Sequence, residues 1–251
     1  MEKEIYEGLV KMRKVPENFK KHPLWRILVD VVKNMPMYAE HKSYVRDVVL
    51  LENPDITFGE LAVMLNITIG ESMVILSELR FWREDLEEEL RKDFPKPRYR
   101  KAVLGGTFNE VHYGHLALIL TGVKNSENLV IGVTTDDFVK SLGKNHSVRN
   151  FNERVRRLEE TLSSYGWLER CKIMPIEDPY GPAVNDPEIE LLVVSPMTYK
   201  RAVEINAIRA QKNLRPLDVA VCPLVVSDDG KPISSTRIAK GEIDATGRCL
   251  T

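Results

Sequence analysis

The sequence predicts an α/β protein in two parts: an all-helical region over residues 1–95, followed by a domain with a parallel β-sheet over residues 98–251. Three observations support this fold class. Apolar residues recur at helical spacing before residue 95. After it, short apolar runs alternate with helical patterns, as in proteins whose parallel strands are buried on both faces. Between the two regions, Pro95 and Pro97 interrupt any helix and indicate a stiff connector.

The first region carries helical patterns at residues 24–32 and 61–65 and no alternating strand pattern. Residues 57–79 resemble a helix-turn-helix, whose second helix would enter the major groove of DNA. However, residues 1–97 hold 15 Lys and Arg residues against 18 Asp and Glu residues. DNA affinity rests largely on neutralised phosphates. We therefore expect residues 1–95 to be a module for docking or dimerisation, through which the protein forms a homo-oligomer. We expect no nucleic-acid partner.

The second region contains apolar runs that we expect to form strands. They lie at residues 102–104, 129–133, 172–176, 191–194, 219–221 and 224–226. Helical patterns between them begin near His115 and cover residues 152–163 and 200–213. Because strands and helices alternate, the strands are joined by crossover connections and the sheet is parallel.

Composition narrows the class of protein. The chain has 251 residues and a formal net charge of −1, so no overall field attracts nucleic acid or a membrane surface. No apolar run approaches the ~20 residues that span a bilayer, and the N-terminus lacks an apolar signal core. The three cysteines show no CxxC spacing and predict free thiols in a reducing compartment. We therefore expect a cytoplasmic protein.

The strongest chemical signal is the segment from Gly105 to His115, where a strand ends, glycines turn the chain and a helix begins near Tyr113 or Gly114. Ligands bind beyond the carboxyl ends of parallel strands, and a helix start attracts anions. His112 and His115 lie one helical turn apart and can both donate hydrogen bonds to phosphate oxygens. Gly114 leaves room for a base or ribose. A zinc site would need further ligands, which the spacing does not supply.

A second signal is the segment Asp229–Ile238, in which an Asp-Gly turn precedes Ser234, Ser235 and Thr236, followed by Arg237. One hydroxyl residue is enough to cap a helix. Three in a row followed by arginine resemble a phosphate cradle. Taken alone, an ordinary capped helix explains this segment equally well. Paired with the histidine segment, phosphate binding is the better explanation.

Together the two segments resemble the nucleotidyltransferase superfamily with its HxGH and ISSTR signatures. More specifically, residues 100–247 are similar to the archaeal and eukaryotic phosphopantetheine adenylyltransferases, whereas the first 95 residues are not. The most specific stretch is Asp-Pro-Tyr-Gly-Pro-Ala at residues 178–183. The resemblance implies a Rossmann-like sheet and a reaction in which ATP and 4'-phosphopantetheine give dephospho-coenzyme A and pyrophosphate. It also implies Mg²⁺ bound with ATP, and no metal held by the protein itself.

The resemblance further implies roles for individual residues. As catalytic residues, His115 would hydrogen-bond the α-phosphate, Thr107 would bind phosphate from the turn, and Lys144 would complete the clamp, with Lys140 as its competitor. The implied ATP-binding residues are Gly105, Gly106, Thr107, Phe108, His112, His115, Ser234, Ser235, Thr236 and Arg237. The implied substrate-binding residues are Thr107, Lys144, Asp178, Ser195 and Arg209.

Some positions depart from the family pattern. Asn109 stands where the family often has Asp, which removes one negative charge near the turn. Residues 195–198 replace the Arg-Gly-x-Arg stretch of the bacterial branch, and Lys200, Arg201 and Arg209 are the candidate substitutes.

Several alternatives stay open from the sequence. Asp178 either faces the substrate or caps its own loop. Enzymes of the same superfamily act on flavin or nicotinamide mononucleotide, although residues 178–183 favour phosphopantetheine. In a different class of function, the helical region would bind DNA while the second domain senses ATP or coenzyme A.

Overall fold

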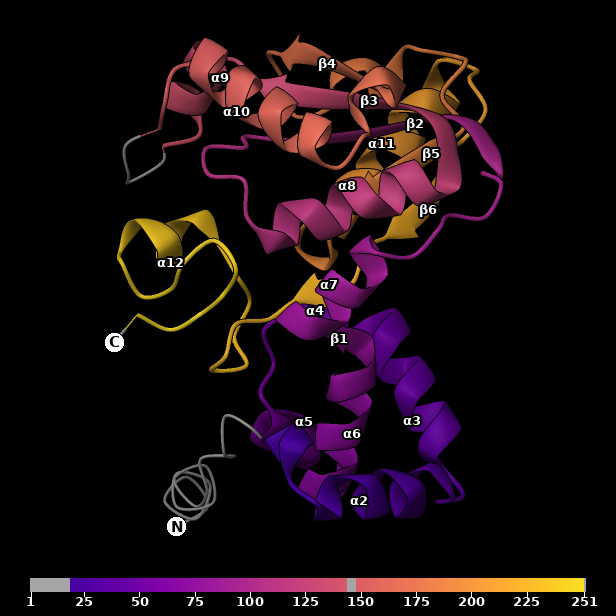
Figure 1. Ribbon diagram of the computed structural model, residues 1–251. Helices are drawn as coiled ribbons and strands as arrows, with labels where there is room; N and C mark the ends of the chain where they lie inside the picture. Colours follow the sequence, from indigo (N-terminus) through magenta and orange to yellow (C-terminus); the bar gives the residue numbers. More distant parts are fainter. Residues whose placement is uncertain (1–18, 144–147, 251) are drawn as a thin grey trace.

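The computed structural model describes residues 19–143 and 148–250 as a helical module joined to an α/β domain (Figure 1). The helical module has its own hydrophobic core, which runs from Val32 to Leu76. Its elements are η1 (Phe19–Lys21), α2 (Leu24–Lys33), α3 (Tyr38–Tyr44), η2 (Val45–Val49), α4 (Leu50–Glu52), α5 (Phe58–Leu65) and α6 (Ile69–Leu79).

The expected helix-turn-helix is present, because α5 begins with a capping box between Thr57 and Glu60 and is bent by 116° from α6. Helix α6 packs one side into the core of the module and buries five side chains there: Glu71, Ser72, Val74, Ile75 and Leu76. The net negative charge of this region remains the argument against DNA binding, because phosphate neutralisation supplies most DNA affinity. Among the described residues, no single helix is long and apolar enough to span a membrane; α5 and α6 pass that test only as this bent pair.

The α/β domain is built on a parallel sheet with the strand order β4-β3-β2-β5-β6. The strands are β2 (Tyr99–Gly106), β3 (Ser126–Thr134), β4 (Cys171–Ile176), β5 (Leu191–Val194) and β6 (Asp218–Val221). This order reverses direction between β2 and β5, as in Rossmann-like folds. The predicted parallel α/β fold is therefore confirmed.

Successive residues of each central strand face two different hydrophobic cores, which explains why the strand sequences are apolar throughout. Leu104 and Ile131 face the core that contains α8, whereas Val103, Val130 and Leu192 face the core that contains α11. Both faces of the sheet are thus covered. The helices of the domain are α8 (Tyr113–Asn125), α9 (Asp136–Ser141), α10 (Phe151–Ser164), η3 (Leu168–Arg170), η4 (Gly181–Val184), η5 (Pro196–Thr198) and α11 (Tyr199–Gln211).

Strands β1 and β7 and helix α7 move the boundary between the two parts of the chain away from the expected position. β1 (Arg80–Phe81) pairs in parallel with β7 (Leu224–Val225), and α7 (Arg83–Leu90) places Leu86 in the core of the α/β domain. The last helix is α12 (Ser235–Ala239). The cores therefore divide the chain near Leu79 and not near residue 95, where the two prolines suggested the boundary. Proline marks a break in a helix but not the end of a domain. The sequence around α7 gives no sign of its packing, because its partner α8 lies more than 20 residues further along the chain.

Candidate active site

The turn after β2 is held tightly by an aromatic ring. Phe108 has a φ of 52° and is fully buried, and its ring would lie 2.9 Å from a Cβ placed on Gly106. A side chain at residue 106 is therefore excluded by close approach. The ring of Phe108 also packs against His115 at a centroid distance of 4.8 Å. The ring of Phe108 thus supports His115 from inside the protein, so the predicted contact with ATP would have to come from the backbone of Phe108.

The two histidines of the first signature are brought together as predicted. His112 caps α8, which begins at Tyr113, and its ring stacks on that of His115 at a centroid distance of 3.8 Å. The backbone N–H of His112 donates to Nδ1 of His115 over 3.4 Å. In the neutral ring of His115 the proton then lies on Nε2, where it can be donated to a phosphate oxygen.

Gly114 has a different role from the one expected. A Cβ placed there would lie 3.0 Å from Cε1 of His112, so the missing side chain makes room for an imidazole ring of the protein itself. A glycine between two histidines therefore allows the His112 ring to fold back over the start of α8.

Burial sets the charge of His112. Its side chain is 7% exposed, and its Nδ1 has no hydrogen-bond partner among the described residues. Burial, together with the neighbouring His115, holds the pKa of His112 well below its ordinary value. The ring of His112 is therefore neutral and lies beside the start of α8 with one buried nitrogen that no described residue satisfies.

This burial predicts an acid-dependent loss of stability. Because the pKa of His112 is lowered in the folded state, the unfolded state takes up the proton first as the pH falls below about 6.5. We expect the free energy of unfolding to fall there by up to ~1.4 kcal/mol per pH unit through this group alone. Urea unfolding of the wild type and of His112→Gln at pH 7.5 and pH 5.5 measures it: the variant should lose less stability, and equal losses would contradict the assignment.

Arg154 anchors the turn from the side of α10. Its side chain is fully buried. It donates to the carbonyl of Thr107 over 2.8 Å and to the carbonyl of Arg149 over 2.9 Å. It also pairs with Asp136 at 2.8 Å. The turn after β2 is thereby tied to both α9 and α10.

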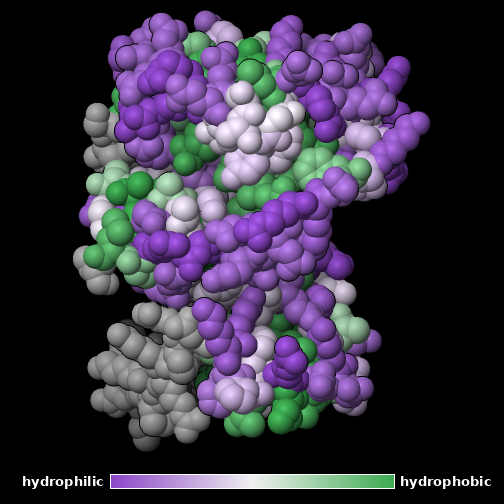
Figure 2. Space-filling view, viewed as in Figure 1, coloured by the Kyte–Doolittle hydropathy of each residue, from purple (hydrophilic) through white to green (hydrophobic). Residues whose placement is uncertain are grey.

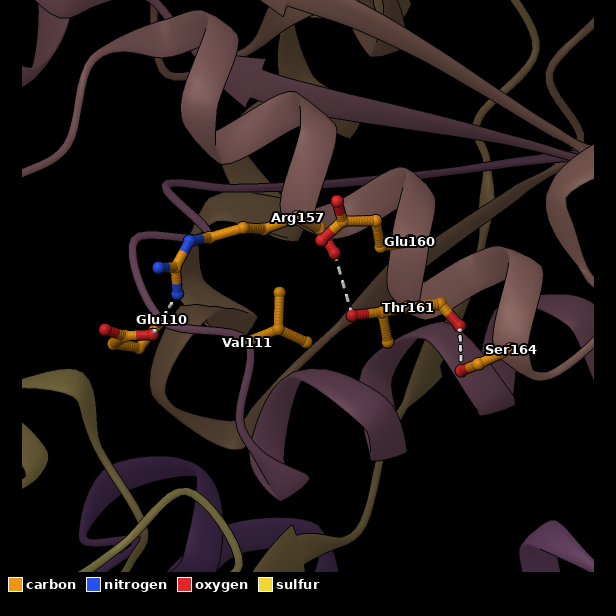
Figure 3. A pocket seen from close by; sticks show the side chains of 6 residues that line it. All are labelled: Glu110, Val111, Arg157, Glu160, Thr161 and Ser164. Atoms are coloured by element: carbon orange, nitrogen blue, oxygen red, sulfur yellow. Dashed lines mark hydrogen bonds and ion pairs between the residues drawn. The ribbon is translucent and has the colours of Figure 1, made fainter.

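The outer side of the same turn is fixed by charge. Glu110 pairs with Arg149 at 2.5 Å and with Arg157 at 3.3 Å. Figure 3 shows Arg157 reaching from α10 to Glu110 across a shallow cavity of about 350 Å³. Asn109 accepts from the backbone N–H of Arg149 over 2.8 Å, so this position anchors the loop without a charge.

The hydroxyl-rich segment folds as a capped turn. Ser234 caps α12 by accepting from the backbone N–H of Arg237 over 3.3 Å. The guanidinium of Arg237 is held by Asp229 at 2.7 Å, Glu242 at 3.0 Å and Ser227 at 2.7 Å. Most of its donors therefore organise the turn, which differs from the direct phosphate grip that the resemblance implied.

The two signature segments meet at the start of α8. The backbone N–H of Tyr113 donates over 3.0 Å to the carbonyl of Ala245, seven residues beyond the end of the second segment. The carbonyl oxygen of Ile233, next to Ser234, lies 3.7 Å from a Cβ placed on Gly114. The segments are far apart in sequence and side by side in the fold, as a shared phosphate site requires.

A cavity of about 230 Å³ opens at the carboxyl ends of the strands. It is lined by Gly105 and Gly106 at the end of β2, by Thr107 after that strand, by Val194 at the end of β5, and by residues 179–183. This is the point where the strand order reverses, which is where ligands of such sheets bind. Most of its lining is apolar, and among the described residues Arg201 is the basic side chain that reaches it.

The predicted substrate-binding residues are only partly at this cavity. Asp178 accepts from the backbone N–H groups of Tyr180 and Gly181 at 2.7 and 2.8 Å, so the loop-capping alternative is the one that the structure shows. Ser195 bonds to Thr198, and it is Thr198 that lines the cavity.

Arg209 is a correction. It is fully buried and donates to the carbonyls of Ala183, Asp186 and Arg215 at 2.7 to 2.9 Å, so it holds the cavity loop from behind and does not contact substrate. Lys144 lies outside the described residues. The competing Lys140 is exposed and pairs with Asp137 at 2.9 Å.

Sequence reasoning missed the anchoring role of Arg154 and left Arg201 as one of several candidates. The signal for Arg154 was weak, because it lies in a charged helix where an exposed arginine has the same local pattern as a buried one. Arg201 falls one turn into α11, and only the packing of that helix against the sheet brings it to the cavity.

Comparison with known proteins agrees with this geometry. The model of the cytidylyltransferase-like family matches residues 103–241. A phosphopantetheine adenylyltransferase of Methanopyrus kandleri is 43% identical over 150 residues, which cover 60% of this chain and 94% of the relative. One from Methanosarcina acetivorans is 42% identical over 151 residues, covering 59% of this chain and 94% of the relative.

A longer relative from Thermoplasma volcanium, a bifunctional phosphopantetheine adenylyltransferase/NTP phosphatase, is 41% identical over 148 residues. The match covers 59% of this chain and 44% of that relative. The chain therefore belongs to the cytidylyltransferase-like family, and within it is similar to the archaeal phosphopantetheine adenylyltransferases.

Proposed function

We propose that the protein is a nucleotidyltransferase that moves the adenylyl group of ATP onto 4'-phosphopantetheine, a step in the synthesis of coenzyme A. The observation that carries the proposal is the meeting of the histidine segment and the hydroxyl-rich turn at the start of α8, beside a cavity at the strand-order reversal. The names of its relatives supply the acceptor substrate.

The proposed step makes one bond and breaks one. An oxygen of the substrate phosphate attacks the α-phosphorus of ATP, and the bond from that phosphorus to the oxygen bridging it to the β-phosphate breaks in line. The products are dephospho-coenzyme A and pyrophosphate. Such transfers ask mainly for positioning and for stabilisation of charge.

The residues of the site fit these two tasks. His115 is proposed to donate from Nε2 to the α-phosphate as negative charge builds up. Thr107 lines the cavity next to the glycine turn and is proposed to contact the phosphates. Ser234, Ser235 and Thr236 are proposed to contact the β- and γ-phosphates from the start of α12.

Mg²⁺ enters the proposal only as a partner of ATP. The described residues contain no group of three or more His, Cys, Asp or Glu side chains that would hold a metal ion. Mg²⁺ keeps several waters and commonly binds through substrate phosphates, where it neutralises their charge.

The acceptor is proposed to lie in the cavity of about 230 Å³, with its apolar arm against the strands. Arg201, whose guanidinium lies 5.3 Å from the ring centroid of Tyr180, would supply positive charge there. This assignment replaces Arg209, which is buried behind the loop.

Pyrophosphate release tests the function. We expect release from ATP and Mg²⁺ only when 4'-phosphopantetheine is added, and little with flavin or nicotinamide mononucleotide. In the same assay, Arg201→Ala should raise the KM for phosphopantetheine about tenfold, the effect of losing one charged contact, and leave the KM for ATP unchanged. Lys200→Ala, one residue away and exposed, is the matched control. Absence of phosphopantetheine-dependent release would overturn the proposal.

We further propose that copies of the protein associate through the helical module. Leu24, Ile27 and Val31 lie on one face of α2 and are each about 60% exposed. Figure 2 shows hydrophobic surface at the foot of the module, where α2 lies. Sedimentation velocity would detect the dimer.

The free thiols of Cys171 and Cys222 support a reducing compartment, and we propose the cytoplasm.

A further inference from the structure

Helix α7 and the two residues before it contact the histidine segment and the turn that leads into Ser234, although they lie outside the family match to residues 103–241. The helix sits between the helical module and the sheet (Figure 1). Leu86, fully buried, anchors it in the α/β core, and Glu89 pairs with Lys124 of α8. The helix is therefore part of the domain that holds the proposed nucleotide site.

The first contact is to the histidine segment. The hydroxyl of Tyr113 donates to Glu87 over 3.0 Å. Burial and this carboxylate raise the pKa of Tyr113 to about 12, so the phenol stays protonated and donates at neutral pH. Tyr113 is the first residue of α8 and follows His112 directly. A fixed Tyr113 ring therefore fixes the turn that carries both histidines.

The second contact is to the turn before Ser234. Asp228 lies 3.7 Å from a guanidinium nitrogen of Arg83. Gly230 has a φ of 78°, and a Cβ placed on it would lie 3.8 Å from the ring of Trp82. The backbone N–H of Val226 donates to the carbonyl of Phe81 over 2.8 Å. The strand and turn that lead into the hydroxyl-rich segment are thus packed on residues 81–83.

We propose that α7 and the two residues before it are a positioning element for ATP: Glu87 sets the start of α8 through Tyr113, and Trp82 with Arg83 sets the turn before Ser234. This proposal rests on the proposed function for the identity of the reaction. The property that we assign to α7 is the affinity of the protein for ATP. The residues that line the acceptor cavity come from β2 to β5, α8, α9, α11 and their loops. Of α8, only Leu118, well inside the helix, lines the cavity, and no residue of 83–90 does. We therefore expect α7 to act on ATP more than on the acceptor.

The test uses the full chain and a double-mutant cycle. We expect Glu87→Ala to raise the KM for ATP about tenfold, the effect of losing one hydrogen bond to a charged group, with the KM for phosphopantetheine unchanged. Tyr113→Phe should give the same change, and the double variant no more than either single one, because all three remove the same contact. Glu87→Gln keeps an acceptor oxygen and should restore most of the affinity.

Glu88→Ala is the matched control, since Glu88 is the next residue, is 72% exposed and pairs with Lys92. Should Glu87→Ala not fold, Arg83→Gln gives the same readout from the second contact. An unchanged KM for ATP, equal changes for both substrates, or additive effects in the double variant would each overturn the proposal. Equilibrium dialysis separates the role of α7 from the proposed transferase activity. It compares the ATP affinity of the wild type and of Glu87→Ala directly, even where the wild type does not turn over phosphopantetheine.

Discussion

Replacing His115 by alanine should lower kcat about 10²- to 10³-fold while the protein stays folded. Removing one donor that stabilises charge in a transition state typically has an effect of this size. His115 is placed for that task, because its Nδ1 accepts from the backbone of His112 and its ring is held between those of Phe108 and His112. Steady-state pyrophosphate release at saturating ATP measures the loss.

The control for this experiment is His22→Ala, because His22 is exposed and lies in the helical module. It should keep wild-type turnover. Circular dichroism of both variants checks that folding survives. Near-normal turnover of His115→Ala would remove this histidine from the mechanism and leave the turn and the hydroxyl residues as the main phosphate ligands.

The largest effect on stability is expected at Arg154. Its side chain is fully buried, and Arg154→Leu would leave the carbonyls of Thr107 and Arg149 without these donors. Each lost hydrogen bond from a charged donor typically destabilises a protein by about 1.5 kcal/mol or more, so we expect a total of about 3 kcal/mol. The ion pair adds little to this, because Asp136 is 45% exposed. Urea unfolding gives the change in free energy from the midpoint and slope.

Arg156→Leu offers the comparison within the same helix. Arg156 is 62% exposed and pairs with Glu160, an exposed i,i+4 pair. Such pairs contribute roughly 0.5 kcal/mol or less. Similar losses for the two variants would show that the buried arginine is not the anchor of the turn.

Strand positions were predictable because their physical cause is local in the sequence. The run from Leu129 to Val133 is apolar throughout because successive residues face two different cores, and both exclude water. The start of α8 was predictable for the same reason, since a glycine turn and a capping position lie next to each other. The boundary near Leu79 was not, because it depends on the pairing of β1 with β7, distant in sequence.

In the site, residue types were easier to predict than their surroundings. His112 and His115 were identified together because one helical turn separates them. Arg209 and Arg201 carry the same charge on the same helix, and only the path of the chain around them buries the first and turns the second to the cavity. Phe108 had no signal for its role under His115, which depends on a left-handed φ.

The pairing of Phe81 with Val225 has a consequence for synthesis of the chain. These strands enclose almost the whole α/β domain, so their contact has a large sequence separation and forms slowly. A ribosome adds residues at about 5–20 per second, so residue 81 waits roughly 10 seconds for its partner to be made. During that interval the helical module can fold on its own core, while β1 stays an open edge. The pairing of β1 with β7 is then completed late, together with the segments that follow residue 225.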